Sequence, residues 1–194
     1  MSDPRLTNDK MFWIDLETEG LDENLDGILE VGCVVTNLKL EVLKQKRWLV
    51  KPGGVGWSPK KLEANNPFVF QMHKKSGLLH DVVAKGQHFT SIGFELLGWL
   101  HDAGLQNKTD PMCGSTIHFD RKFIKNYWPQ VEARFSYRNI DVSSEKETIL
   151  RYHPEWAAEL DAMRTEKVKA HRAIPDILES IEEFKFYRIK RGDL

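Results

Sequence analysis

A strand-like segment near the N-terminus reads MFWIDLE over residues 11–17. Because side chains alternate along a strand, Asp15 and Glu17 share one face with Trp13. The apolar residues Phe12, Ile14 and Leu16 lie on the other face. Apolar residues on both faces are typical of a central, buried strand. Two carboxylates at the carboxyl end of such a strand repel each other in a partly dry site, and a bound cation would relieve that repulsion. Open α/β sheets also bind their ligands at this end of the strands.

This short motif has a simpler interpretation, in which Asp15 and Glu17 lie at a solvated strand end or cap the next turn. Two further acidic residues stand at the start of expected helices. Asp120 follows CGSTIHF, residues 113–119, and Asp176 follows HRAIP, residues 171–175. The helix dipole favours a carboxylate in a first turn, so both also have a purely structural explanation. His171 precedes the last helix on a loop, either as a surface residue or within reach of a site.

Together these residues form a chemically coherent set. The hard oxygen donors of Asp15, Glu17, Asp120 and Asp176 suit Mg²⁺ or Mn²⁺ better than zinc. Two such ions roughly 4 Å apart can clamp the attacking and leaving oxygens of a phosphodiester. His171 would then take a proton from the attacking water.

The composition limits the class of protein. The 194 residues are 41% hydrophobic and 29% charged, with a net charge of −1. These values exclude a disordered or fibrous chain and argue against coating long nucleic acids or membranes through bulk charge, while a site for a short nucleic acid stays possible. Cys33 and Cys113 lie among apolar neighbours, which favours reduced core thiols and no zinc cluster. Without a signal peptide or a membrane-length apolar stretch, we expect a cytoplasmic protein with no membrane partner.

The order of elements predicts an α/β fold with a mixed central β-sheet flanked by α-helices. Strands are expected at 11–16, 28–36, 41–50, 110–113 and 137–142, and helices at 58–75 with a break at Pro67, 89–100, 120–127, 144–151 and 175–188. The short turns between the first three strands make them antiparallel. Residues 1–10 are expected to be a flexible N-terminus before a single domain over 11–190, residues 51–57 form a glycine-rich loop, and residues 154–168 stay unassigned.

The order Asp-x-Glu, then Asp, then His-x₄-Asp resembles the DEDDh 3′→5′ exonucleases, which have an RNase H-like fold. Segments that resemble the oligoribonucleases are WIDLE (13–17), GLD (20–22), HKKSGL (73–78), CG (113–114), DR (120–121), YR (137–138), IDVS (140–143) and HRA (171–173). The resemblance implies a homodimeric exoribonuclease that degrades short single-stranded RNA, especially dinucleotides, to 5′-mononucleotides with two divalent ions. It implies that Asp15, Glu17, Asp120 and Asp176 hold the metals and that His171 is the general base.

The resemblance also implies a set of substrate contacts. Leu21 would wedge between two bases, Phe68 would stack on a base where the family more often has tryptophan, and Tyr137 would be donated by the partner subunit. A polar cap on the far phosphate matches His73, Thr116, Arg138 and Ser143. Such a cap would close the cleft after two nucleotides. Core packing is the alternative role for the three apolar and aromatic residues.

The chain departs from the family pattern at several positions. Glu19 stands where the family usually has threonine, so an added carboxylate would alter metal affinity or repel a substrate phosphate. Pro175 replaces an acidic residue, His118-Phe119 replace a small polar pair, and residues 51–70 fit poorly. Two other functions stay open: a broader exonuclease that trims single-stranded DNA or RNA, and a non-catalytic nucleic-acid-binding module, which the five catalytic positions disfavour.

Overall fold

The computed structural model describes residues 9–53, 57–105, 108–163 and 171–194. Within these ranges six strands form one sheet in the order β4-β3-β2-β1-β5-β6. The strands are β1 (Lys10–Thr18), β2 (Ile28–Asn37), β3 (Val42–Lys51), β4 (Gln87–His88), β5 (Met112–Gly114) and β6 (Asn139–Asp141). The first three strands pair antiparallel, whereas β5, β6 and β4 join parallel to their neighbours. The prediction of a mixed α/β sheet is confirmed, while the expectation for residues 1–8 lies outside the described residues.

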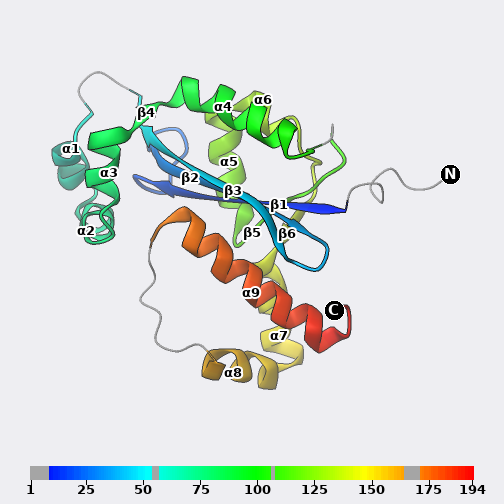
Figure 1. Cartoon of the computed structure of the whole chain (residues 1–194). Helices are drawn as coiled ribbons and strands as arrows, with labels where there is room; N and C mark the ends of the chain where they lie inside the picture. Colours follow the sequence, from blue (N-terminus) through cyan, green and yellow to red (C-terminus); the bar gives the residue numbers. More distant parts are fainter. Residues whose placement is uncertain (1–8, 54–56, 106–107, 164–170) are drawn as a thin grey trace.

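Helices cover both faces of this sheet (Figure 1). Their bounds are α1 (Pro59–Asn65), α2 (Pro67–Lys75), α3 (Leu78–Lys85), α4 (Phe89–Asp102), α5 (Ile117–Tyr127), α6 (Pro129–Glu132), α7 (Val142–Tyr152), α8 (Pro154–Met163) and α9 (Ala173–Arg191). Helices α4, α5 and α6 lie on one face, and α7, α8 and α9 lie on the other. Helices α1 to α3 gather at one end of the sheet.

The two faces of β1 enter two different cores. Phe12, Ile14 and Leu16 pack in the core that contains α4 and α5. Trp13 packs in the core beneath α9, where its ring meets that of Phe184 at a centroid distance of 5.6 Å. Because alternation puts the two β1 carboxylates on the Trp13 face, they point toward α9.

Most expected elements are present, with some shifts at their ends. The helix break at Pro67 is confirmed. Helix α5 begins at Ile117, three residues before the expected start, and α7 begins at Val142, where the sequence predicted the last residue of a strand. Helix α3 was not predicted; it follows Gly77, whose φ of 76° ends α2 sharply, and it buries Leu78. Residues 54–56 of the expected loop lie outside the described residues.

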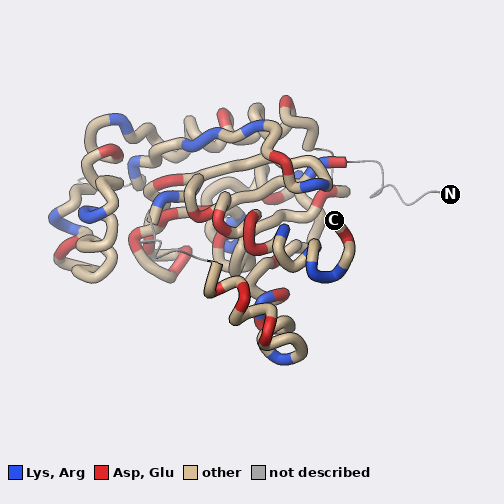
Figure 2. The backbone as a smooth tube through the Cα atoms, turned by 60° about the horizontal axis from the view of Figure 1, so that its bottom comes forward, with Lys and Arg blue, Asp and Glu red and all other residues tan. Residues whose placement is uncertain are grey.

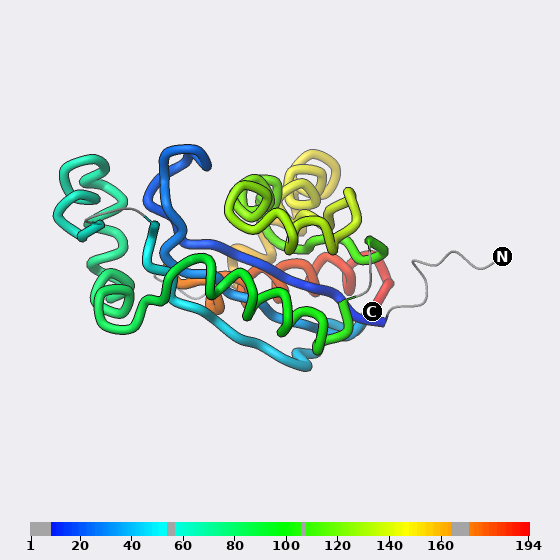
Figure 3. Tube along the Cα trace, turned by 90° about the horizontal axis from the view of Figure 1, so that it is seen from above, coloured from blue at the N-terminus to red at the C-terminus, as the bar shows by residue number. Residues whose placement is uncertain are grey.

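The loop that connects β1 to β2, residues 19–27, follows the carboxyl end of β1. In Figure 3 it stands between α1 and α2 on one side and α5 on the other. Asn66 donates a hydrogen bond to the Glu19 carbonyl, and Lys122 of α5 donates one to the Leu21 carbonyl at 2.9 Å. These contacts hold the loop from both sides.

Basic and acidic residues are interspersed along the chain trace in Figure 2. This distribution agrees with the net charge of −1. Among the described residues, none of the helices combines the length and the apolar character that a membrane crossing requires.

Candidate active site and metal centre

Three carboxylates meet where β1 ends and α9 begins. One oxygen from each of Asp15, Glu17 and Asp176 lies within 4.8 Å of the others. Gly32 makes this approach possible, because a Cβ at that position would lie 2.7 Å from the Cβ of Ala173 in the first turn of α9. Gly32 pairs with Asp15 in the sheet, so the start of α9 rests directly beside the acidic end of β1. Three hard oxygen donors on neighbouring rigid elements fit a divalent cation such as Mg²⁺ or Mn²⁺.

Asp120 reaches the same strand from α5. Its Oδ1 accepts a hydrogen bond from the Leu16 backbone N–H at 2.9 Å, between the two carboxylates of β1. Burial raises the pKa of Asp120 to about 7, against the lowering effect of that hydrogen bond, and the charge of Asp141 adds to the rise. The fourth predicted metal ligand is therefore attached to β1, although it is not one of the three residues whose oxygens gather within 4.8 Å.

The electrostatics of the cluster favour a bound cation. Burial raises the pKa of Glu17 to about 8, and repulsion from Asp176 and Glu30 acts in the same direction. Burial and repulsion from Asp120 hold the pKa of Asp15 well above its usual range. With a pKa of about 8, Glu17 would hold a proton at neutral pH unless a positive charge were bound beside it. Glu17 is buried, so the alternative of a solvated strand end does not hold for it, whereas Asp15 is partly exposed.

His73 lies beside the cluster and is fully buried. Its Nε2 donates to the Thr18 carbonyl at 2.9 Å, and its Nδ1 lies 3.8 Å from Glu17 Oε2 with no hydrogen-bond partner among the described residues. Burial lowers the pKa of His73, and the nearby charge of His171 lowers it further. The structure thus places His73 beside Glu17. His73 takes no part in the hydrogen bonds that join Thr116 and Ser143, two other residues of the expected cap.

His171 occupies the turn immediately before α9 and is partly exposed. Its φ of 46° lies in the left-handed region, which residues with a Cβ rarely adopt. The charge of His171 is one of the causes that lower the pKa of His73, after burial. His171 thus stands five residues before Asp176, on the segment that leads into α9.

Three expected substrate contacts are strongly exposed. Leu21 is 78% exposed, Phe68 is 78% exposed and Tyr137 is 79% exposed. Core packing is therefore wrong as an explanation for all three. Leu21 lies on the β1–β2 loop and Phe68 at the start of α2, on the two sides joined through Asn66.

The remaining cap residues gather at the edge of the sheet. The Thr116 N–H donates to Asp141 Oδ1 at 2.9 Å and lies 3.1 Å from Ser143 Oγ. Asp141 also accepts from the Ser143 N–H at 3.0 Å, which caps α7. Arg138 lies over the ring of Tyr137, with 4.3 Å from the guanidinium carbon to the ring centroid. Sequence reasoning missed the organising role of Asp141, which its position directly before a helix could have indicated.

Two further residues that sequence reasoning missed support this region. Arg121 holds Glu132 at 2.7 Å and donates to the Arg138 carbonyl at 3.2 Å, so it ties α5 to the segment before β6. Trp57 donates its indole N–H to Glu19 Oε1 at 2.6 Å, while Glu19 Oε2 accepts from the Gly27 N–H at 3.0 Å. Both oxygens of the unusual carboxylate are thus engaged within the fold.

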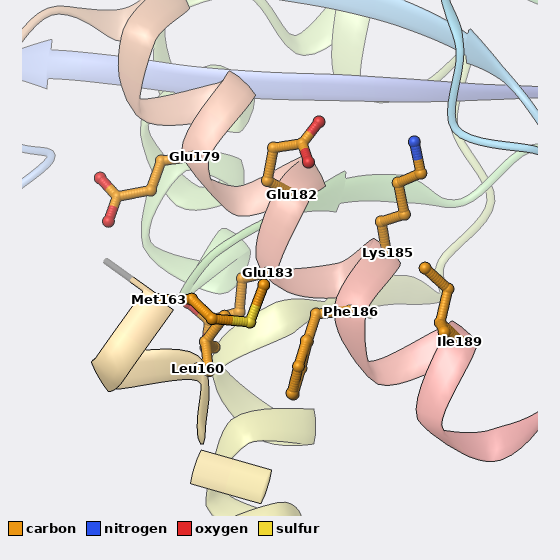
Figure 4. A pocket seen from close by; sticks show the side chains of 8 residues that line it. All are labelled: Leu160, Met163, Glu179, Glu182, Glu183, Lys185, Phe186 and Ile189. Atoms are coloured by element: carbon orange, nitrogen blue, oxygen red, sulfur yellow. The ribbon is translucent and has the colours of Figure 1, made fainter. Parts of the chain in front are cut away.

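A hollow of about 300 Å³ lies between α8 and α9. Figure 4 shows Leu160 and Met163 of α8 near Phe186 of α9, with Glu179 and Lys185 directed away from them. None of the predicted catalytic residues lines it. It is separate from the acidic cluster and supplies no group to it.

Comparison with known proteins agrees with this geometry. Residues 12–184 match the RNase T family of exonucleases. The chain is 35% identical over 183 residues to an oligoribonuclease of Leifsonia xyli, covering 94% of this chain and 84% of the relative. An oligoribonuclease of Chromobacterium violaceum is 36% identical over 180 residues, covering 92% of this chain and 93% of the relative.

The fold also resembles solved structures at low identity. E. coli exonuclease I in complex with a dA16 oligonucleotide has a TM-score of 0.72 at 14% identity, covering 96% of this chain and 42% of that chain. This likeness concerns the RNase H-like fold alone. The family match and the curated relatives show that the chain belongs to the oligoribonucleases of the exonuclease family and is a 3′→5′ exonuclease.

Proposed function

We propose that this enzyme degrades short oligoribonucleotides, especially dinucleotides, to 5′-mononucleotides with the help of two Mg²⁺ or Mn²⁺ ions. The observation that carries the proposal is the meeting of Asp15, Glu17 and Asp176 within 4.8 Å, with Asp120 bonded to the same strand. Four carboxylates from three elements, with Glu17 and Asp120 buried and Asp15 and Asp176 partly buried, suit cation-assisted hydrolysis of a phosphodiester.

The chain supplies the framework for that reaction. When bound, the cations supply positive charge that offsets the carboxylates and the charge that develops on the phosphodiester. Asp15, Glu17, Asp120 and Asp176 hold the cations and so fix where the scissile phosphate lies. His171, on the turn before α9, accepts the proton of the attacking water and so makes it a better nucleophile.

Several exposed groups support a preference for short substrates. Leu21 and Phe68 stand on tied elements with most of their surface in solvent, which suits contacts with two bases. Thr116, Arg138 and Ser143 supply polar groups where a terminal phosphate would end the site. His73, buried beside Glu17 and bonded to the Thr18 carbonyl, has no contact with these three residues among the described residues.

We also propose that the enzyme is a cytoplasmic homodimer, in which the partner subunit's Tyr137 completes the site. Tyr137 is largely exposed and pairs with Arg138, so its ring is available to a neighbouring subunit. Both cysteines are free and buried, which agrees with a reducing compartment.

A broader exonuclease acting on longer single strands is the second candidate. The likeness to exonuclease I, solved with a dA16 oligonucleotide, favours it. A basic groove for longer strands would make their binding strongly dependent on salt.

The test is a length series of labelled ribo- and deoxyribo-oligomers from two to about ten nucleotides, with Mg²⁺ and with Mn²⁺. We expect the highest kcat/KM on the ribodinucleotide, whereas a rate that rises with length would favour the broader exonuclease. Asp15→Ala should abolish hydrolysis and leave the fold intact. Asp102→Ala, which removes an acid paired with a surface histidine on α4, is the matched control. Full activity of Asp15→Ala would defeat the assignment.

A further inference from the structure

A buried carboxylate on β2, Glu30, is held by two arginines. It lies opposite Glu17 in the β1–β2 register and is fully buried. Arg172 Nε lies 2.9 Å from Glu30 Oε2, and Arg47 Nη1 lies 3.2 Å from Glu30 Oε1. Because a buried charge is strongly destabilising unless it is paired, these contacts are firm features of the fold.

The Arg172 guanidinium also reaches two other elements. Its Nη2 lies 2.9 Å from Asp81 Oδ2 on α3, and its Nη1 donates to the Ser76 carbonyl at the end of α2, 3.4 Å away. The planar fork of an arginine holds several acceptors in one geometry, which the point charge of a lysine does not. One side chain therefore joins the start of α9 to β2, α2 and α3.

His171 stands directly before this anchor in a strained backbone conformation. Its φ of 46° is disfavoured for a residue with a Cβ, and such a conformation persists where the surrounding contacts determine it. On the other side, the Arg172 carbonyl accepts a hydrogen bond from the Asp176 N–H at 3.1 Å. Arg172 is thus linked to the expected proton acceptor and to a metal-binding carboxylate.

We infer that Arg172 is a positioning residue, whose contacts with Glu30 and Asp81 fix the turn that carries the His171 ring. The inference rests on the proposed role of His171 as proton acceptor. Arg172 does not touch the reacting atoms and acts through His171. Helix α2 carries Phe68, the residue expected to stack on a base. Arg172 therefore connects the helix that carries Phe68 to the segment that carries His171, the expected proton acceptor.

Two variants weaken the contacts of the Arg172 side chain with Glu30 or Asp81, and in both of them Glu30 keeps a positively charged partner. Arg172→Lys keeps the positive charge and loses the forked guanidinium group. Asp81→Asn keeps an oxygen that accepts a hydrogen bond from Arg172 and loses the negative charge. The matched control is Glu147→Gln, which removes an exposed carboxylate paired with an arginine on α7. We expect both variants to lower kcat on a ribodinucleotide about tenfold and to keep KM within about twofold, because a misplaced proton acceptor slows the chemical step more than it weakens binding. The control should keep both constants.

Two further measurements separate positioning from general stability. In a His171→Ala background, Arg172→Lys should lower kcat by less than about twofold, since residues that act as a unit are not additive. In NMR spectra of the metal-free protein, Arg172→Lys should shift the imidazole resonances of His171 and leave those of His153, at the end of α7, unchanged. An unchanged kcat, an equal loss in the His171→Ala background or an unmoved His171 signal would overturn the inference.

These outcomes are distinguishable from a failure of the proposed function. If the unsubstituted chain hydrolyses no short oligonucleotide, the proposed function fails. The NMR comparison needs no turnover, and in that case it decides by itself whether Arg172 holds His171.

Discussion

Replacing Glu17 by glutamine should stabilise the metal-free protein at alkaline pH. The side chain of Glu17 is buried, and burial together with repulsion from Asp176 raises its pKa from 4.5 to about 8. In the unfolded chain the same carboxyl ionises near its ordinary value. Between these two pKa values the folded protein holds one proton more than the unfolded chain, so the free energy of unfolding falls as the pH rises through that window.

The size of the effect follows from the two pKa values. A rise from 4.5 to about 8 corresponds to at most about 5 kcal/mol of lost stability once the pH exceeds 8. Glu17→Gln removes the charge and should recover much of that loss at pH 9. For a chain of this size, each kcal/mol moves Tm by roughly 2–4 °C, so the variant should melt up to about 10–20 °C higher. At pH 4, where the unfolded glutamate is also protonated, the two proteins should differ little.

Differential scanning calorimetry from pH 4 to pH 9 in EDTA measures this difference. Glu147→Gln, an exposed substitution on α7, is the matched control and should follow the unsubstituted protein at every pH. Millimolar Mn²⁺ should raise the Tm of the unsubstituted protein at pH 9, because a ligand that binds the folded state stabilises it. The same addition should raise the Tm of Glu17→Gln much less.

A Tm that does not change with pH would refute this reasoning. If the Tm of the unsubstituted protein in EDTA did not change between pH 5 and pH 9, and Glu17→Gln melted at the same temperature, the carboxylates would not repel one another in a dry site. The electrostatic argument for a cation site at the end of β1 would then fail, whatever the activity.

Three further substitutions test the substrate site. Leu21→Ala should raise KM for a ribodinucleotide roughly tenfold in steady-state assays, since a contact with a base contributes about 1–3 kcal/mol, and an unchanged KM would exclude the wedge. Trp57→Phe removes the N–H that Glu19 accepts, so urea denaturation should show a loss of about 1 kcal/mol, and KM should rise as the loop loosens; equal stability would show that this bond does not hold the loop. Tyr137→Ala should lower kcat/KM without lowering Tm, because its side chain is exposed, and mixing it with Asp15→Ala chains should restore activity. Failure of the mixture to recover would contradict donation of Tyr137 between subunits.

Local patterns predict the sheet and the acidic set well. The apolar alternation around Asp15 marks β1 as a central strand, and both of its faces are buried. Pro67 marks a helix boundary because its ring fixes φ and removes a backbone donor. Element order alone predicts a mixed sheet, since short turns require antiparallel neighbours and helical crossovers allow parallel ones.

Contacts between distant residues are what these patterns miss. Nothing near Glu30 in the sequence indicates that Arg172, 142 positions away, forms an ion pair with it. Trp57 lies in a segment that fits the family poorly, and its bond to Glu19 depends on how two loops fold together. Helix α3 is short, and its apolar residues show their role through packing against β2. Such contacts depend on tertiary geometry, which local periodicity does not encode.

The pairing of Glu17 with Glu30 across β1 and β2 places a structural acid next to a proposed metal ligand. Both carboxylates are buried on the same face, and each needs a positive partner. Glu30 receives two guanidinium groups from the chain itself. Within the described ranges, no lysine or arginine forms an ion pair with Glu17; its neighbour is His73, which a lowered pKa keeps neutral. Under the proposed function, the chain neutralises one member of the pair and leaves the other to a bound cation, so that substrate hydrolysis and the stability of this end of the sheet would depend on the same ion.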